Sequence, residues 1–393
     1  MILPILFVNF GEDHVSGQER VLLDIATGLD PGRFKPVVWC NSDRLAQACL
    51  AAGITVHRTQ FQFYFDFSSP RFSPGRYFSL VREALRLVRL HGIRVAHANG
   101  AAPVQWLAPA CFLSGCRLVL HLHTRYLRRS RYVLLLHTVD HVVGVSRHVT
   151  EGLLSDGVQA DRVQVIHNGI DPGRVRSSAR DLRQELGIAP GDFVVCSLGT
   201  LLPLKGFDIL MRSVAALPPR AHLLIAGDGP SRPALEQLRG ELGLASRVHF
   251  LGRTDDVMAV YQSSDVFALA SLQEGFPLVT IEAALAGLPV VATRVGGNPE
   301  SVADGVSGLL VQPGDHEAMA AALLRLLGDP GLRARMGEAG RRNATSLFTV
   351  RRMILSFEAL YEALSKPVRN PARLSRLMPY IRLARAGART PGN

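Results

Sequence analysis

Short apolar runs, each followed by a longer amphipathic stretch, repeat along both halves of this sequence. That alternation is typical of a mainly parallel β-sheet with helices on both faces. The strands predicted in the first half are Ile2–Val8, Lys35–Cys40, Val95–Ala98, Arg117–His121, His141–Val145 and Val163–Ile166. Those predicted in the second half are Phe193–Leu198, His222–Ala226, Val248–Phe250, Val266–Ala270, Pro289–Thr293 and Gly308–Val311. The pattern predicts an α/β chain in which each half forms its own doubly wound, Rossmann-like domain.

The length of 393 residues supports two domains, because it exceeds what one hydrophobic core normally organises. The turn-rich segment 168–173 and a polar helix predicted near Ser177–Leu186 indicate a hinge between the halves. We therefore predict a first domain over residues 1–170, a second over 171–365 and a tail over 366–393. The final helices before the tail either pack on the second domain or return to pack on the first. Ligands of doubly wound sheets bind at the carboxyl ends of strands, so two such domains facing one another predict a central cleft.

The composition excludes several classes of protein. The chain is 47% hydrophobic and 20% charged, which is ordinary for a soluble α/β protein. Its five cysteines are odd in number and show no Cys-x2-Cys spacing, which argues against a disulfide framework and against a zinc site. The apolar opening Met1–Val8 lacks the basic start and small-residue cleavage site of a signal peptide, and no apolar stretch is long enough to cross a bilayer. These features predict a cytoplasmic protein.

Two acidic residues eight positions apart follow one of the predicted strands. Glu274 lies in the loop after the strand that ends near Ala270, and Glu282 lies on the helix predicted to begin at Pro277. Unpaired backbone N–H groups and the dipole at such a helix start favour an anion such as a phosphate. A carboxylate on the first turns is also well placed to accept hydrogen bonds from a ribose diol. By itself the pair is weak, because two glutamates near a helix often arise by chance.

Further loops at strand ends support a phosphate site. Residues 197–206 follow a strand and open a helix, so Lys205 can present its ammonium group to the same anion. Tight turns at 226–230, 250–253 and 295–300 follow other strands on the same side. The order and spacing of these motifs resemble the nucleotide-binding domain of retaining glycosyltransferases of family 4, which have the two-domain GT-B fold. The specific part of this resemblance covers about residues 190 to 315.

The first half resembles the same family more loosely. The segment containing Gly17 resembles the family's first loop, in which glycine amides contact the donor phosphate, although Ser16 stands where the family usually has a glycine. His123 matches the strand-end histidine near the transferred sugar. Residues 143–147 and 165–171 resemble the two motifs that close the first domain. A further departure is Thr200, which replaces a common arginine. Either another arginine, Arg253 or Arg294, compensates for the lost guanidinium group, or the donor site is weakened.

The resemblance implies a retaining hexosyltransferase that uses a UDP- or GDP-linked sugar and a glycan or lipid-linked acceptor, in the synthesis of cell-surface polysaccharide or glycolipid. The first domain would then serve the acceptor and the second the donor. The catalytic residues implied are Glu274, His123 and Lys205. The residues implied in donor binding are Gly17, Lys205, Arg253, Phe276, Leu278 and Glu282.

Each of these residues has an expected partner. Lys205, Gly17 and the amides of Phe276 and Leu278 would contact the diphosphate, and Glu282 the ribose. In the same scheme Glu274 would contact the hydroxyl groups of the sugar, His123 would lie near its reacting carbon, and Arg253 would frame the base through its backbone. Since no Asp-x-Asp motif lies beside these loops, we expect no metal and no other cofactor.

Three alternatives remain open. A sugar-nucleotide epimerase of the same architecture would need an acid/base pair that removes a C2 proton. A non-catalytic sugar-nucleotide-binding protein is suggested by Ser16 and Thr200. A nucleic-acid protein is suggested only by the calculated pI near 10.0, with no recognised module, so we expect no nucleic-acid partner.

The formal charge of +11 is unevenly distributed. After Glu362 no acidic residue occurs, and the tail carries the basic residues Lys366, Arg369, Arg373, Arg376, Arg382, Arg385 and Arg389. Apolar residues from Leu374 to Ile381 recur at helical spacing within it, although Pro379 interrupts the pattern. A second basic cluster is formed by Arg125, Arg128, Arg129 and Arg131. These clusters predict peripheral contact with the anionic inner face of a membrane, and a solvated basic face is the alternative.

Overall fold

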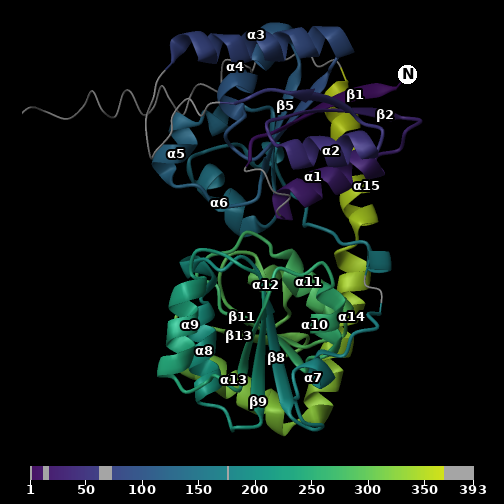
Figure 1. Ribbon diagram of the computed structural model, residues 1–393. Coiled ribbons are helices and arrows are strands. Elements are labelled where there is room, and N and C mark those ends of the chain that lie inside the picture. The colour runs from purple at the N-terminus through teal and green to yellow at the C-terminus, as the bar shows by residue number, and fades with distance from the viewer. Residues whose placement is uncertain (1, 12–16, 62–72, 175–176, 367–393) are drawn as a thin grey trace, which may run out of the picture. The chain divides into compact units, whose positions relative to one another are not determined.

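A computed structural model describes residues 2–11, 17–61, 73–174 and 177–366 of the chain (Figure 1). The chain divides into two compact units. Unit 1 comprises the residues up to His167 together with the segment that starts at Val350, and unit 2 comprises Asn168–Thr349. The division thus lies three residues before the predicted end of the first domain, and the helix α15 (Val350–Ser365) belongs to unit 1.

The described part of unit 1 contains a seven-stranded sheet in the order β3-β2-β1-β4-β5-β6-β7. Its strands are β1 (Leu3–Asn9), β2 (Phe34–Cys40), β3 (Thr55–Arg58), β4 (Val95–Asn99), β5 (Arg117–Leu122), β6 (His141–Gly144) and β7 (Val163–Val165). All neighbouring strands are parallel. Central strands are buried on both faces, which is why they read as continuous apolar runs in the sequence.

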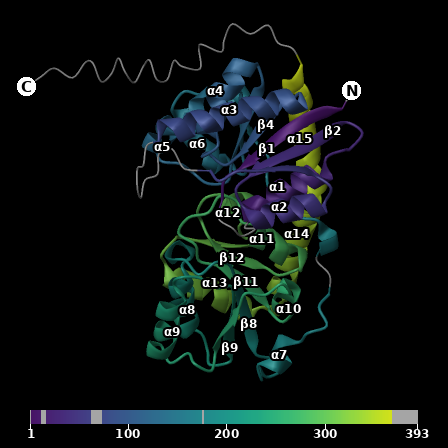
Figure 2. The ribbon, with the colours of Figure 1, turned by 45° about the horizontal axis from the view of Figure 1, so that its top comes forward.

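Helices cover both faces of this sheet (Figures 1 and 2). They are α1 (Gly17–Gly28), α2 (Asp43–Ala51), α3 (Pro74–His91), α4 (Val104–Ser114), α5 (Arg128–Val133), α6 (Arg147–Ser155) and α15, with short 3-10 turns η1 (Leu136–Thr138) and η2 (Ala160–Arg162). On one face His97 of β4 contacts Phe357 and Tyr361 of α15, while Trp39 of β2 contacts Trp106 of α4 on the other. The alternation of side chains along each strand therefore produces two cores, one on either face.

The described part of unit 2 contains a six-stranded parallel sheet in the order β10-β9-β8-β11-β12-β13. Its strands are β8 (Phe193–Leu198), β9 (Ala221–Ala226), β10 (Val248–Gly252), β11 (Val266–Leu269), β12 (Val290–Thr293) and β13 (Gly308–Val311). Successive residues of a strand enter different cores: Val195 packs in one cluster, and Val194 and Cys196 pack in the other. The fold is thus α/β with two doubly wound units, as predicted.

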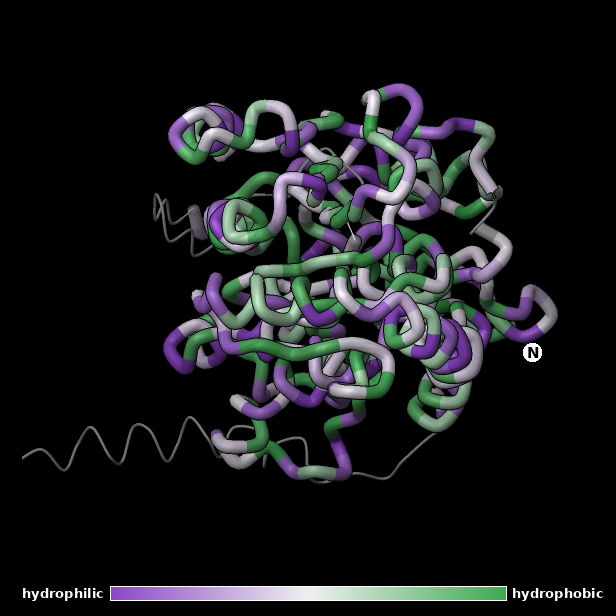
Figure 3. Tube along the Cα trace, turned by 90° about the horizontal axis from the view of Figure 1, so that it is seen from below, coloured by the Kyte–Doolittle hydropathy of each residue, from purple (hydrophilic) through white to green (hydrophobic). Residues whose placement is uncertain are grey.

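The helices of unit 2 again flank the sheet on both sides (Figure 1). They are α7 (Leu182–Glu185), α8 (Phe207–Ala215), α9 (Arg232–Glu241), α10 (Val257–Gln262), α11 (Leu278–Leu285), α12 (Asn298–Ser301), α13 (His316–Gly328) and α14 (Pro330–Leu347), with 3-10 turns η3 (Pro172–Arg174) and η4 (Pro203–Lys205). Polar and apolar residues alternate around the helical coils in Figure 3. No helix in the described part of the chain is long and apolar enough to span a bilayer.

Each sheet has one point at which the direction of winding reverses. In unit 1 this point lies between β1 and β4, and in unit 2 it lies between β8 and β11. The loops that leave the two central strands there run to opposite faces of the sheet, so a crevice forms beyond their carboxyl ends. The residues predicted to carry chemistry follow these strands: Lys205 follows β8 and Glu274 follows β11.

Candidate functional site

Lys205 and Glu274 form an ion pair at the switch point of unit 2. The Lys205 Nζ atom lies 2.7 Å from Glu274 Oε1, and Ser271 Oγ donates a second hydrogen bond of 2.7 Å to the same oxygen. The side chain of Glu274 is 8% exposed and that of Lys205 is 25% exposed. Both charges therefore lie at the edge of the sheet with hydrogen-bonding capacity left over, because an ammonium group has three donors and a carboxylate has a second oxygen.

Two glycines allow the loops that carry these side chains to meet. Gly206, at φ 64°, packs against the backbone of Ala270, and an added Cβ atom would stand 2.2 Å from the Ala270 oxygen. Gly296, at φ 54°, packs in the same way against Glu274, whose carbonyl oxygen would lie 1.8 Å from an added Cβ. Any side chain at either position would push the loops apart. The glycine-rich turns seen in the sequence thus have a specific role in bringing Glu274 to the site.

The start of α11 supplies the backbone of the predicted diphosphate site. Pro277 is the N-cap and Leu278 the first helical residue, one position later than predicted. The amide of Leu278 has no acceptor within its own helix because it belongs to the first turn. Phe276 is buried, and its carbonyl accepts a 3.1 Å hydrogen bond from Asn168 Nδ2, which fixes the loop before the helix. The sequence had placed Asn168 in a motif closing the first domain, whereas it belongs to unit 2.

Glu282 lies on α11 and is held by Tyr261 of α10. The Tyr261 hydroxyl donates a 3.0 Å hydrogen bond to Glu282 Oε2. Tyr261 is fully buried, and its burial, together with the charge of Glu282, raises its pKa well above the usual value, so the hydroxyl keeps its proton. Sequence reasoning missed Tyr261, because the two residues are 21 positions apart on different helices.

The remaining predicted positions in unit 2 are Arg253, Thr200 and Arg294. Arg253 is exposed in the loop after β10, and Thr200 is exposed in the loop after β8. Arg294 forms an ion pair with Asp304 over 2.5 Å, so its guanidinium group is already engaged near the end of β12. Of the two arginines considered as substitutes for the one absent at Thr200, the structure therefore leaves Arg253 as the better candidate.

In unit 1 a chain of hydrogen bonds ends on His123. Glu19 of α1 accepts from Asn9 Nδ2 at 3.3 Å, Asn9 Oδ1 accepts from Asn99 Nδ2 at 2.7 Å, and His123 Nε2 lies 2.8 Å from Asn99 Oδ1. Because Asn99 presents its oxygen to the ring, His123 must donate from Nε2, which leaves Nδ1 as a hydrogen-bond acceptor. Asn9 and Asn99 are register partners at the ends of β1 and β4, which is the switch point of this sheet. Sequence reasoning identified His123 but not the residues that orient it.

The imidazole of His123 is one of three that lie together. The rings of His121 and His123 are 4.2 Å apart, and those of His97 and His121 are 5.2 Å apart. Burial lowers the pKa of His123 to about 4 and that of His97 to about 3, and it lowers the pKa of His121 well below the usual value. All three are therefore neutral at pH 7, which fits a hydrogen-bonding role for His123 rather than a cationic one.

Some of the remaining predicted residues lie in the described part of the chain, and others lie outside it. Gly17 is the first residue of α1, while Ser16 and the tail residues from Arg369 onward lie outside the described residues. Arg131 is not part of an exposed basic patch, because it is buried and paired with Asp156 at 2.7 Å. Arg128 and Arg129 remain exposed. Within the described residues, no cluster of three or more histidine, cysteine or acidic side chains could hold a metal ion.

The two halves of the chain match two models of known families. Residues 15–174 match the one described as Glycosyltransferase Family 4, and residues 178–343 match the one described as Glycosyl transferases group 1. The chain belongs to the family 4 glycosyltransferases. The matched ranges include His123 in the first case and Lys205, Glu274 and Glu282 in the second.

Solved structures support the GT-B fold of this family 4 chain. Anabaena Alr3699/HepE in complex with UDP is similar with a TM-score of 0.80 and 27% identity, over 92% of this chain and 100% of that one. A glycosyltransferase from Rickettsia africae has a TM-score of 0.82 at 19% identity, over 93% of this chain and 100% of that one. The second likeness concerns the fold alone.

Curated relatives match a smaller part of the chain. The D-inositol 3-phosphate glycosyltransferase of Corynebacterium glutamicum (strain R) is 41% identical over 194 residues, which is 45% of this chain and 46% of that protein. The protein of the same name from Salinispora arenicola is 38% identical over 216 residues, or 49% and 48% of the two chains. The chain thus spans about half the length of the curated relatives it matches.

Proposed function

We propose that this protein transfers a hexose, with retention of anomeric configuration, from a nucleoside diphosphate sugar to a glycan or lipid-linked acceptor. The observation that carries the proposal is the 2.7 Å pair of Lys205 and Glu274 at the switch point of unit 2. A cation there suits the diphosphate and a carboxylate suits sugar hydroxyl groups. The similar protein from Anabaena was solved with UDP-glucose at 27% identity, which favours a UDP-linked donor over a GDP-linked one.

The proposed chemistry is front-face substitution. The bond between the anomeric carbon and the phosphate oxygen breaks, a bond to the acceptor oxygen forms on the same face, and the acceptor's proton passes to the departing phosphate. Lys205, Gly17 and the amides of Phe276 and Leu278 stabilise the charge that develops on the diphosphate. Because an ammonium group and helix-terminal amides supply this stabilisation, we propose that no metal ion is needed.

His123 and the two glutamates have separate roles in this proposal. Glu282, oriented by Tyr261, binds the ribose diol, and Glu274 binds hydroxyl groups of the transferred sugar. His123 accepts a hydrogen bond from the sugar through Nδ1, since its Nε2 donates to Asn99. Arg253, exposed after β10, frames the base through its backbone.

The acceptor of this transfer has two candidates. The curated relatives are named for D-inositol 3-phosphate, so an inositol phosphate is a second candidate for the acceptor. Against it, the similarity spans only about half of each chain. We retain a glycan or lipid-linked acceptor for cell-surface polysaccharide or glycolipid synthesis. The basic tail 366–393 would hold the enzyme at the inner, cytoplasmic face of an anionic membrane.

The proposal is tested by measuring binding and turnover in sequence. A thermal-shift panel of UDP, GDP, ADP and their glucose conjugates should show stabilisation by UDP and UDP-glucose. Incubation of UDP-glucose with glycan, lipid-linked and inositol phosphate acceptors, with and without excess EDTA, should then give an α-linked product in both cases, since the donor's α-configuration is kept. Release of an isomerised sugar without acceptor would instead indicate an epimerase. Binding of UDP without turnover across the acceptors would indicate a binding protein.

A further inference from the structure

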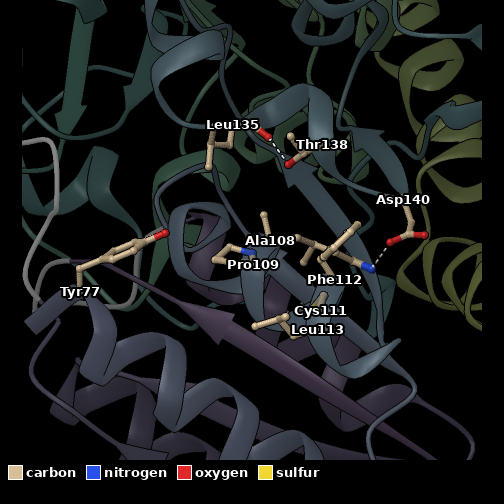
Figure 4. A pocket seen from close by; sticks show the side chains of 10 residues that line it. Tyr77, Ala108, Pro109, Cys111, Phe112, Leu113, Leu135, Thr138 and Asp140 are labelled. Atoms are coloured by element: carbon tan, nitrogen blue, oxygen red, sulfur yellow. Dashed lines mark hydrogen bonds between the residues drawn. The ribbon is translucent and has the colours of Figure 1, made fainter. Parts of the chain in front are cut away.

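An apolar cavity of about 390 Å³ lies in unit 1 between α3, α4 and the turn η1 (Figure 4). This volume is within the range of roughly 300 to 1,000 Å³ that is usual for sites of small ligands. The apolar part of its wall comes mainly from α4 and includes Ala108, Pro109, Phe112 and Leu113, and Leu118 of β5 adds to it. Leu118 lies at the start of β5 and His123 follows its end, so about 16 Å of strand separates Leu118 from His123.

The cavity offers a ligand little but apolar surface, because its polar groups are already hydrogen-bonded. The Tyr77 hydroxyl donates to the carbonyl of Gln105 at 3.1 Å, and Thr138 Oγ1 donates to the carbonyl of Leu135 at 2.7 Å. Asp140 accepts from Arg117 at 2.7 Å and from the amide of Leu118 at 2.9 Å. A polar ligand would lose hydration without gaining partners, so the chemistry of the wall selects an aliphatic chain.

Two unusual backbone features shape the cavity. Pro109 lies inside α4 and has no N–H, so the carbonyl of Gln105 loses its helical partner and is satisfied by Tyr77 of α3 instead. Leu135 has φ 59° and is the one non-glycine residue in the described ranges with a positive φ. Such a conformation persists only where the surrounding structure enforces it. The cavity thus lies between the hydrogen-bonded helices α3 and α4 on one side and the strained turn at Leu135 on the other.

Exposed apolar side chains lie at the cavity, and the helix α3 beside it is rich in basic residues. Phe112 and Leu113 at the end of α4 are 56% and 69% exposed, and Phe78 on α3 is 63% exposed. The helix α4 carries no charged residue, whereas α3 carries Arg76, Arg82, Arg86 and Arg89 against the single acid Glu83. Exposed aromatic and aliphatic residues beside a helix with excess positive charge complement the surface of an anionic bilayer.

We propose that the α3–α4 cavity binds one acyl chain of an anionic bilayer lipid. The exposed side chains of Phe112 and Leu113 would enter the apolar layer beside that chain, while the arginines of α3 would contact the headgroups. This contact is separate from the basic tail, and it rests on the proposed membrane location but not on the transfer reaction.

Chain binding is tested first in solution with cis-parinaric acid, whose fluorescence rises in an apolar site. The full-length protein should bind it, and Ala108→Phe, which fills the cavity, should weaken binding at least tenfold. Ala51→Phe makes the same change at an exposed position of α2 and should alter the affinity less than twofold. UDP binding should be equal in all three proteins, which reports on folding and tests the proposed function separately. Absence of binding to the wild type, or equal binding by Ala108→Phe, would overturn the proposal.

A second experiment tests whether the bound chain belongs to an anionic bilayer lipid. It uses vesicles of phosphatidylglycerol or phosphatidylcholine in which an acyl chain carries a photoactivatable diazirine. Cross-links from phosphatidylglycerol should map by mass spectrometry to α4 and to residues 135–138, and Ala108→Phe should lose these cross-links. Equal cross-linking from phosphatidylcholine would refute an anionic lipid as the occupant. Cross-links confined to residues 366–393 would refute the cavity as the site.

Discussion

The hydroxyl of Tyr261 donates a 3.0 Å hydrogen bond to Oε2 of Glu282, so a fully buried side chain of α10 orients the carboxylate proposed to hold the donor ribose. The bond joins two helices of unit 2. Its donor keeps its proton, because burial and the neighbouring carboxylate raise the pKa of Tyr261 well above the ordinary value. The carboxylate of Glu282 is therefore fixed in direction, as a hydrogen-bond acceptor for a diol should be.

Loss of either member of this pair should weaken nucleotide binding to different degrees. Glu282→Ala removes hydrogen bonds from a charged acceptor, which are worth about 1.5–3 kcal/mol, so UDP affinity should fall by about tenfold to a hundredfold. Tyr261→Phe removes only the orienting bond and should cost tenfold or less. Tyr361→Phe makes the same change in unit 1 at an equally buried tyrosine and should leave the affinity unchanged. Calorimetric titration with UDP measures all three, and wild-type affinity in Glu282→Ala would exclude Glu282 from the site.

Glu274→Ala should depress turnover more than nucleotide binding, since its proposed partner is the transferred sugar. Its carboxylate is held by Lys205 and Ser271, so the variant also frees the ammonium group to move. We expect kcat to fall by at least a hundredfold while the Kd for UDP changes less than fivefold. Glu317→Ala, at an exposed position of α13, is the control and should match the wild type. If Glu274→Ala lost UDP binding while its turnover stayed normal, the proposed roles of Glu274 and Glu282 would be exchanged.

Gly296→Ala should damage the site through packing rather than through charge. The new Cβ would stand 1.8 Å from the Glu274 carbonyl oxygen, and the backbone φ of 54° adds roughly 1–2 kcal/mol for any L-residue. Gly314→Ala carries the same kind of backbone penalty at φ 82° but meets no atom within 4 Å. The first variant should therefore lose at least tenfold in UDP affinity and melt at a lower temperature than the second. Equal behaviour of the two would show that the Glu274 loop can move away.

The sequence predicted the strands well where a segment is buried and its apolar residues follow the pattern of a buried strand. Most strands in the described residues lie within a residue or two of their predicted bounds, because strands buried on both faces read as apolar runs. The strand β3 was missed, since Thr55–Arg58 is short, polar and exposed at both ends at the edge of its sheet. The helix predicted near Ser177–Leu186 is limited to Leu182–Glu185, after the N-cap Asp181.

The candidate site was predictable only in part. Lys205, Glu274, Glu282 and His123 could be identified because each follows a strand in a motif that resembles one of family 4. Their supports could not, because these come from distant parts of the chain: Asn99 lies 90 residues from Asn9, and Asn168 lies 108 residues from Phe276. No local pattern encodes such pairs. The first arises because the parallel strands β1 and β4 bring their carboxyl ends to one edge.

The buried histidines should make the fold less stable at acidic pH. Burial lowers the pKa of His123 to about 4 and of His97 to about 3, while in the unfolded chain both take up protons near pH 6.5. The unfolded chain therefore binds more protons in this window, so their contribution is complete above pH 6.5 and is lost as pH falls toward 4. Each such group adds up to about 1.4 kcal/mol of free energy of unfolding per pH unit.

Denaturant titrations at pH 7.5, 6.5 and 5.5 test this dependence. His121→Phe replaces a buried ring whose two nitrogens lack partners, so the slope with pH should decrease without loss of stability at pH 7.5. His316→Phe, at an exposed position of α13, should leave the slope as in the wild type. A wild-type stability that rises on acidification from pH 7.5 to 5.5 would contradict the neutral state of these histidines in the fold.

Thr200→Arg should tighten the binding of nucleoside diphosphates. Thr200 is exposed in the loop after β8, so a longer side chain there can extend into solvent. A guanidinium group beside Lys205 would add a bidentate partner for phosphate oxygens, worth about 1.5–3 kcal/mol for a charged hydrogen bond. We expect UDP affinity to rise about tenfold and uridine affinity to stay constant, because only the phosphates gain a contact. Thr345→Arg adds the same charge at an exposed position of α14 and controls for long-range attraction. A loss of UDP affinity in Thr200→Arg alone would mean that the loop after β8 directs position 200 away from the diphosphate, and that the charge of Lys205 suffices in this protein.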